Sequence, residues 1–407
     1  MPSSKPEASH KGLKEIAFAF LKLGATAYGG PAIIGIMQAE LQEKRQWVSK
    51  ERFIEGLSLV NMLPGAAATQ LGIFLGYARG GWLGGLLAGL CFVLPAFVIM
   101  LALTLTYAAF GATPLMNGAL YGLGPVVLGI FMVAVYRLGK TAAATIPQLV
   151  VAAGAALAAA FTPLGIVPIL AFAGGIGMFL YYSRTKGAVV VGVLLALVAT
   201  VYLAPWSGLA LQPGATSAPG AAQAPSLLDI GSFFLTVGAF SFGGGLTLIA
   251  FIQEQVVTQY QWLTHREFID GLALGQFTPG PILMVSAYVG YKLAGLSGAA
   301  VAAAAIFLPA FVLMLSILPA IERARKLVWT KAAMKGIGPA VIGVLAVSLV
   351  QMAPHAVPDM IAAALCIATV VAMLAWKVGA IKPMLLGAVF GVVRERLLSL
   401  PGIRGVL

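Results

Sequence analysis

Long apolar stretches separated by short polar loops occupy most of the chain. Between Phe53 and Tyr136 the only charged residues are Glu55 and Arg79, and the stretch 141–183 carries no charge. A helix crosses the hydrocarbon core of a bilayer with about 20 apolar residues, and these stretches lack the apolar–polar alternation of membrane β-strands. The pattern therefore predicts an all-α polytopic membrane protein embedded in a lipid bilayer.

Apolar segments of crossing length recur in both halves of the chain. We expect continuous spanning helices at 82–108, 116–137, 143–161, 164–182 and 187–206, and then at 296–320, 329–350, 357–376 and 379–397. Glycine and proline interrupt four further segments near their middle, at Gly29-Gly30-Pro31, Pro64-Gly65, Gly243-Gly244-Gly245 and Pro279-Gly280-Pro281. Proline lacks an N–H group and glycine adopts positive φ easily, so each interruption predicts two half-helices that meet at a tip. We expect re-entrant hairpins or strongly broken helices; the alternative is ordinary spanning helices with kinks.

The same motifs appear twice along the chain. Corresponding motifs lie 214 or 215 residues apart: Gly29-Gly30 with Gly243-Gly244, Trp47 with Trp262, Pro64-Gly65 with Pro279-Gly280, the LPAF stretches 94–97 and 308–311, and the stretches 122–125 and 336–339. This register predicts two homologous halves. We place a cytoplasmic tail at 1–11, the first repeat at 12–186, a connecting helix and flexible linker at 187–226, the second repeat at 227–397 and a C-terminal tail at 398–407.

Basic residues mark opposite loops in the two halves. Lys44, Arg45, Lys50 and Arg52 follow the first segment, whereas the equivalent stretch 255–267 has Arg266 as its one lysine or arginine. The loop at 108–116 has no charge, whereas 323–335 carries Arg323, Arg325, Lys326, Lys331 and Lys335. Because such residues mark cytoplasmic loops, the reversal predicts an inverted repeat with a cytoplasmic N-terminus. Arg394, Arg396 and Arg404 do not fit, since this topology places them outside.

The composition narrows the function. Charged residues make up 9% of the 407 residues, against about 25% in soluble domains, which excludes a soluble enzyme, a disordered protein and a nucleic-acid-binding domain. The net charge of +12 is typical of basic cytoplasmic loops. Cys91 and Cys366 lie in apolar segments, and the three histidines are scattered. No catalytic, metal-binding or cofactor motif appears, so we expect no enzyme activity, no metal and no cofactor.

The interrupted segments point to an anion site. Half-helices that begin at a tip present free N–H groups and the positive ends of their dipoles. Neutral hydrogen-bonding side chains accompany them, namely Asn61, Thr69, Gln70, Gln276 and Thr278. Lys22 lies two turns before the first tip; it either faces the site or extends toward the interface.

Acidic residues recur at matching positions, as Glu40 with Glu254 and Glu55 with Asp270. Carboxylates inside membranes often carry coupling protons. The structural interpretation, which we favour from the sequence, is that these acidic residues lie at helix ends beside basic neighbours.

The combined motifs resemble those of the chromate ion transporter family. The first half contains F-x-K-x-G-x-x-A-Y-G-G-P, E-x-x-x-x-x-x-W-V and L-P-G-x-x-x-T-Q-x-G, and the second contains F-G-G-G, W-L and T-P-G-P. The resemblance covers about residues 12–397, as in a long member with two domains. It implies export of chromate across the bacterial inner membrane and chromate resistance, with coupling to protons or exchange against sulfate as the options.

The family motifs fall on Gly29, Gly30, Pro31, Asn61, Pro64, Gly65, Gln70, Gly243, Gly244, Gly245, Gln276, Pro279, Gly280 and Pro281. The tip at Pro64-Gly65 departs from the family by reading L-P-G-A in place of P-G-P.

The alternative functions are an anion channel or a sulfate transporter of the same architecture. An intramembrane enzyme is disfavoured because no nucleophile–base pair is present. The sequence leaves open whether the chain forms a homodimer.

Overall fold

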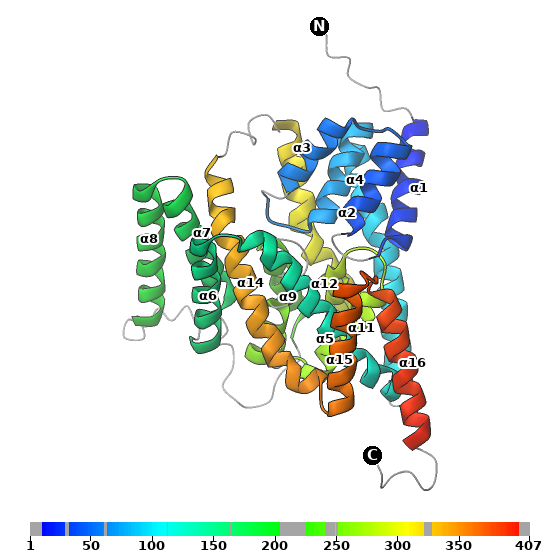
Figure 1. Ribbon diagram of the computed structural model, residues 1–407. Helices are drawn as coiled ribbons and strands as arrows, with labels where there is room; N and C mark the ends of the chain where they lie inside the picture. The colour runs from blue at the N-terminus through cyan, green and yellow to red at the C-terminus, as the bar shows by residue number, and fades with distance from the viewer. Residues whose placement is uncertain are drawn as a thin grey trace.

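The fold consists of long helices joined by short connections (Figure 1). The computed structural model describes residues 10–28, 32–60, 63–111, 113–162, 164–203, 225–240, 249, 251–320 and 328–398. The first half contains α1 (His10–Thr26), α2 (Ala32–Met37), η1 (Gln38–Lys44), α3 (Lys50–Val60), α4 (Ala67–Phe110), α5 (Pro114–Ala142), α6 (Ile146–Phe161), α7 (Ile166–Tyr181) and α8 (Arg184–Leu203). The second contains α9 (Leu227–Ala239), η3 (Glu254–Gln259), α11 (His265–Phe277), η4 (Ile282–Met284), α12 (Val285–Ile317), η5 (Leu318–Ala320), α14 (Val328–Ala356), α15 (Met360–Ala375) and α16 (Ile381–Leu398).

Helix length and hydropathy identify a polytopic membrane protein. Four helical stretches are long and apolar enough to cross a bilayer: Ala67–Phe110, Pro114–Lys140, Ile282–Ile317 and Lys331–Ala356. Shorter apolar helices occupy Ile146–Phe161, Ile166–Tyr181, Leu227–Ala239 and Met360–Ala375. The described residues contain helices and no strand, so the predicted all-α class is confirmed.

The long helices α4 and α12 are each a hairpin. In α4, Gly80 and Gly81 leave the helical region, with φ of −135° and 64°, and Gly76 packs directly on Gly84 and Ala88. The arm 67–79 therefore lies antiparallel to the spanning part 82–110. In α12, Gly295 has a φ of 61°, and the short arm returns along the long one in the same way.

Both ends of the first interrupted segment lie beside the C-terminal end of the second. The Glu15 carboxylate on α1 lies 3.6 Å from Arg45 Nη1, at the end of η1, and 3.3 Å from Arg79 Nη2, at the end of the short arm of α4. It also accepts a 3.1 Å hydrogen bond from Trp47 Nε1. This closeness of the segment ends agrees with the expected re-entrant hairpins, which stay a prediction.

The two halves pack on each other through two equivalent pairs of helices. Helix α5 of the first half packs on α16 of the second half, where Gly122 lies directly against the Gly387 carbonyl. Helix α14 of the second half packs on α7 of the first half, where Gly336 lies directly against the Ala173 carbonyl. Both residues of the second contact lie 214 positions from their counterparts in the first. Small residues allow helices in membranes to approach this closely, so the glycines hold the two halves together reciprocally.

The central helices α4 and α12 cross in opposite directions. A Cβ atom placed on Gly85 would lie 3.3 Å from Leu315 Cδ2, and one on Gly89 would lie 2.6 Å from the Phe311 ring. Positions rise along α4 as they fall along α12, so these equivalent helices are antiparallel. That arrangement agrees with an inverted repeat, which stays a prediction about membrane topology.

Cysteine labelling tests the inverted topology. Ser49 and its counterpart region at Gln259 are both exposed. We expect Ser49→Cys and Gln259→Cys, each in a chain lacking Cys91 and Cys366, to react with an impermeant thiol reagent from opposite sides of the membrane. Labelling of both from the same side would contradict the inverted repeat.

Arg394, which departs from the expected charge distribution, has an acidic partner. Its guanidinium lies 3.5 Å from Asp359 Oδ2 and 4.1 Å from the centre of the Tyr121 ring. The Tyr121 hydroxyl also donates to the Asp359 carboxylate at 2.7 Å. The ion pair offsets the charge of Arg394 locally.

Candidate functional site

The described tips of the interrupted segments both lie against the crossing of α4 and α12. Gly65 has a φ of 128° and Gly280 a φ of 90°. A Cβ atom on Gly65 would lie 3.4 Å from Ala310 of α12, and one on Gly280 would lie 2.9 Å from Ala96 of α4. Each tip therefore packs on the spanning helix of the opposite half, at the alanine of its LPAF motif. Glycine is required at both positions because a side chain would be strained and crowded.

Several predicted site residues lie outside the described part of the chain. They are Gly29, Gly30, Pro31, Asn61, Gly243, Gly244 and Gly245. The remaining predicted residues at the tips are Pro64, Gly65, Thr69, Gln70, Gln276, Thr278, Pro279, Gly280 and Pro281, and these stand on the segments that flank the α4–α12 crossing.

Polar side chains that follow the tips at Gly65 and Gly280 in the sequence are fully buried. The Gln70 side-chain amide donates a 2.6 Å hydrogen bond to the Pro64 carbonyl, which closes the tip. Gln70 Oε1, Thr69 Oγ1 and Ser286 Oγ have no hydrogen-bond partner in the structure. Unpaired buried polar atoms are uncommon and costly, so these three atoms mark places where a ligand or water is expected.

Backbone and side-chain groups at the Gly280 tip are already hydrogen-bonded within the protein, which the sequence does not indicate. The Gly280 N–H donates a 2.7 Å hydrogen bond to the Ala27 carbonyl at the break after α1, and Pro281 has no N–H to offer. The Thr278 hydroxyl donates to the Leu274 carbonyl at 2.9 Å. The Gly280 N–H is therefore already used in this conformation, because the tip is tied to the first half, and the anion site at the tips stays a prediction.

Lys22 lies on an exposed part of α1. Its carbonyl accepts a 2.7 Å hydrogen bond from the Thr26 hydroxyl, so the helix is intact up to the break. The exposed ammonium group leaves both sequence interpretations of Lys22, a site residue or an interfacial one, as predictions.

Three of the four acidic candidates have basic partners. Glu40 lies 3.0 Å from Arg45 Nε, and Glu55 lies 2.7 Å from Arg52 Nη1. Asp270, which is 4% exposed, lies 3.5 Å from Arg266 Nε and accepts a 3.0 Å hydrogen bond from the Tyr107 hydroxyl of the first half. These carboxylates are therefore held in ion pairs.

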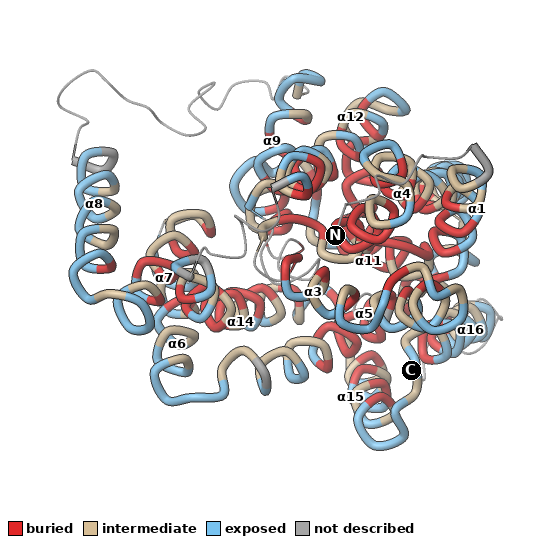
Figure 2. Tube along the Cα trace, turned by 90° about the horizontal axis from the view of Figure 1, so that it is seen from above, coloured by how far each residue is buried: buried red, intermediate tan, exposed pale blue. Residues whose placement is uncertain are grey.

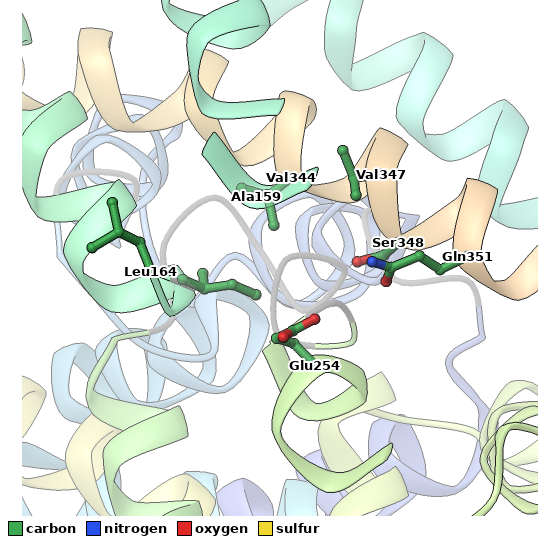
Figure 3. A pocket seen from close by; sticks show the side chains of 8 residues that line it. Ala159, Leu164, Glu254, Val344, Val347, Ser348 and Gln351 are labelled. Carbon is green, nitrogen blue, oxygen red and sulfur yellow. The ribbon is translucent and has the colours of Figure 1, made fainter. Parts of the chain in front are cut away.

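Glu254 differs from the other three carboxylates. It begins the π-helix η3, as Glu40 lies in the equivalent π-helix η1, and π-helical turns occur often at functional sites. No lysine or arginine of the described residues lies within ion-pair distance of Glu254. Its side chain is half-buried and lines a small cavity with Ser348 and Gln351 of α14 (Figure 3).

The sequence did not point to the neighbours of Glu254. Gln253 is 1% exposed, and neither its amide nitrogen nor its amide oxygen has a partner. Gln253 and Ser348 line a second small cavity, so Ser348 borders both cavities. A comparison of the two repeats identifies these residues, because the second repeat differs from the first at each of them: Gln253, Ser348 and Gln351 correspond to Ala39, Ala134 and Arg137.

The described residues contain no group of three His, Cys, Asp or Glu side chains that could hold a metal ion. Neutral donors and helix ends at the tips suit an oxyanion.

Comparisons with known proteins agree on one family. The family described as chromate transporter matches twice, over residues 14–179 and 228–392. The chromate transport protein of Cupriavidus metallidurans is 34% identical over 90% of this chain and 88% of its own length. The chromate transport protein of Pseudomonas aeruginosa is 32% identical over 88% of this chain and 86% of its own. An uncharacterized transporter of Methanocaldococcus jannaschii is 28% identical over 75% of each. No solved structure matches the chain.

Proposed function

This chain belongs to the chromate transporter family, and from that premise we propose that it is a secondary transporter that exports chromate across the bacterial inner membrane. The observation that carries the proposal is the double family match, which falls on two halves with equivalent broken segments. A membrane potential that is negative inside favours the exit of a dianion, by about 2.3 kcal/mol for each charge per 100 mV. The proposed direction therefore needs no nucleotide.

The proposed substrate site lies between the two halves, at the α4–α12 crossing. The support is the approach of both tips to this crossing, together with the unpaired buried atoms of Thr69, Gln70 and Ser286. The tip residues outside the described part of the chain, among them Gly30 and Gly244, stay in the proposal as backbone donors. A tetrahedral oxyanion accepts several hydrogen bonds at once, which converging helix ends supply.

The two repeats differ in exposure, which supports transport by alternating access. Ile54 of α3 is 51% exposed, whereas its counterpart Ile269 of α11 is 2% exposed. Helix α11 packs on α4, α5 and α14, and Figure 2 shows α3 near the centre of the view from above. In an inverted repeat, exchange of these two environments opens the opposite side. We therefore propose that this conformation is open toward the N-terminal face.

Transport assays in vesicles test the proposed function. We expect inside-out vesicles containing the protein to accumulate labelled chromate, to respond to an imposed pH or sulfate gradient, and to show counterflow. A channel would show downhill flux without counterflow. A sulfate transporter of the same architecture would take up sulfate and leave chromate outside. Vesicles that move no chromate would refute the proposal.

Lys22 provides a side-chain test of the site. If Lys22 faces the substrate path, Lys22→Gln removes a positive charge and raises the chromate concentration needed for half-maximal transport. The charge effect weakens with salt when the ammonium group is exposed. Lys14→Gln, on the same helix, is the control and should leave this concentration unchanged. Equal values for Lys22→Gln and the wild type would assign Lys22 to the interface.

A further inference from the structure

We propose that Glu254 carries a proton that moves together with the anion, and that Ser348 and Gln351 hold the water through which this proton arrives. The inference rests on the proposed transport function and deepens it. It assigns the coupling to one carboxyl group of the second repeat and names two residues that hold water beside it.

The first argument is that no described lysine or arginine pairs with Glu254. An adjacent cation stabilises the ionised form of a carboxyl group, and Glu40, Glu55 and Asp270 each have an arginine within 3.5 Å. The neighbour of Glu254 on its own helix is instead Gln259, a neutral amide. Of the four carboxyl groups, Glu254 is therefore the one that can gain and lose a proton without breaking an ion pair among the described residues.

The second argument is the unpaired amide of Gln253. Both polar ends of this side chain are buried without a partner, and buried polar groups of native proteins are normally satisfied by protein or by ordered water. The cavity beside it is of water-molecule size and adjoins the cavity of Glu254 at Ser348. Water in the cavity of Glu254 would contact Ser348 and Gln351, and the unpaired amide of Gln253 marks a further polar position next to Ser348.

The third argument is the apolar wall around the carboxyl group. The cavity is otherwise lined by Ala159 of α6, Leu164 and Ile166 beside α7, and Val344 and Val347 of α14. Neither α6, α7 nor α14 brings a charged or titratable group into this lining, and Gln259 is the contact from η3. A charge is costly in such surroundings, and a dianion bound elsewhere in the protein adds repulsion that proton uptake by Glu254 relieves.

The proton step changes no bond of the anion. A hydronium ion in the water-filled cavity transfers its proton to a Glu254 carboxylate oxygen and becomes water. The neutral carboxyl group no longer repels an approaching dianion. When the anion leaves on the other side, the O–H bond of Glu254 breaks and the proton returns to water.

The test measures proton and chromate flux together in proteoliposomes that contain a pH-sensitive dye and have a clamped membrane potential. We expect chromate influx through the wild type to acidify the lumen. Glu254→Gln, which keeps the size and hydrogen bonding of the side chain, should pass chromate without acidification. Glu40→Gln, at the equivalent position of the first repeat, should retain the wild-type ratio of protons to chromate.

Two results would overturn the inference: acidification through Glu254→Gln at the wild-type ratio, or chromate flux without protons in the wild type. If Glu254→Gln stops all flux, thermal-shift titration with chromate decides. Binding that has lost its pH dependence supports the inference, and binding that keeps it contradicts the inference. Ser348→Ala should slow acidification and leave chromate binding unchanged. Wild-type liposomes that move no chromate would refute the proposed function and not this assignment alone.

Discussion

We expect Gly280→Val to insert into the membrane at normal levels and to lose chromate transport. The Gly280 backbone has a φ of 90°, which costs a residue with a side chain about 1–2 kcal/mol. The added Cβ would also lie 2.9 Å from Ala96 and would push the tip away from α4. The hydrogen bond from Gly280 to Ala27 would be lost with it, so the broken segment of the second half would separate from the first half.

The measurement is chromate export by cells or vesicles, normalised to the amount of protein in the membrane. Gly192→Val on α8 is the matched control, because no atom lies within 4 Å of the position of its Cβ, and it should transport at the wild-type rate. Gly244→Val, at a tip residue outside the described part of the chain, is expected to behave as Gly280→Val does. Wild-type export by both tip variants would exclude the tips as the substrate site.

We expect Gly122→Val and Gly336→Val each to lower the thermal stability of the protein in detergent. Gly122 lies against the Gly387 carbonyl and Gly336 against the Ala173 carbonyl, with no room for a side chain. Overpacking of a close contact costs about 1–3 kcal/mol, and more where backbone must move. Because the contacts are reciprocal, we expect similar losses for the two variants.

The unfolding temperature of purified protein provides the measurement. Gly154→Val on α6 is the control, since no atom lies within 4 Å of its Cβ position. Unchanged unfolding temperatures for Gly122→Val and Gly336→Val would contradict the reciprocal packing of α5 on α16 and of α14 on α7.

Much of the architecture could be predicted because local sequence carries it. Apolar segments longer than a bilayer crossing became helices, and the glycine and proline interruptions near Gly65 and Gly280 became tips. The repeat register matched positions that are structurally equivalent, such as the turns at Gly81 and Gly295. The predicted helix 329–350 was too short, however, since α14 continues to Ala356 through Pro354.

The site depended on contacts that no local pattern contains. The sequence presented Glu40, Glu55, Glu254 and Asp270 as equal pairs, and the tertiary structure separated them by giving arginine neighbours to three. In the sequence, Gln253 and Ser348 are single polar residues in apolar segments and give no signal of function. In the structure both residues line one cavity, and Ser348 also lines the cavity of Glu254.

The sequence by itself therefore determined the class, the repeat and the break points at Gly65 and Gly280, because hydropathy, proline and glycine act on the residues next to them. Only the tertiary structure decided which N–H groups are already used and which candidate carboxyl group has no basic partner among the described residues. The hydrogen bond between Gly280 and Ala27 and the cavity shared by Glu254 and Ser348 each join segments far apart in the chain. Such pairings depend on how helices pack, and packing between distant segments is not written in the local order of residues.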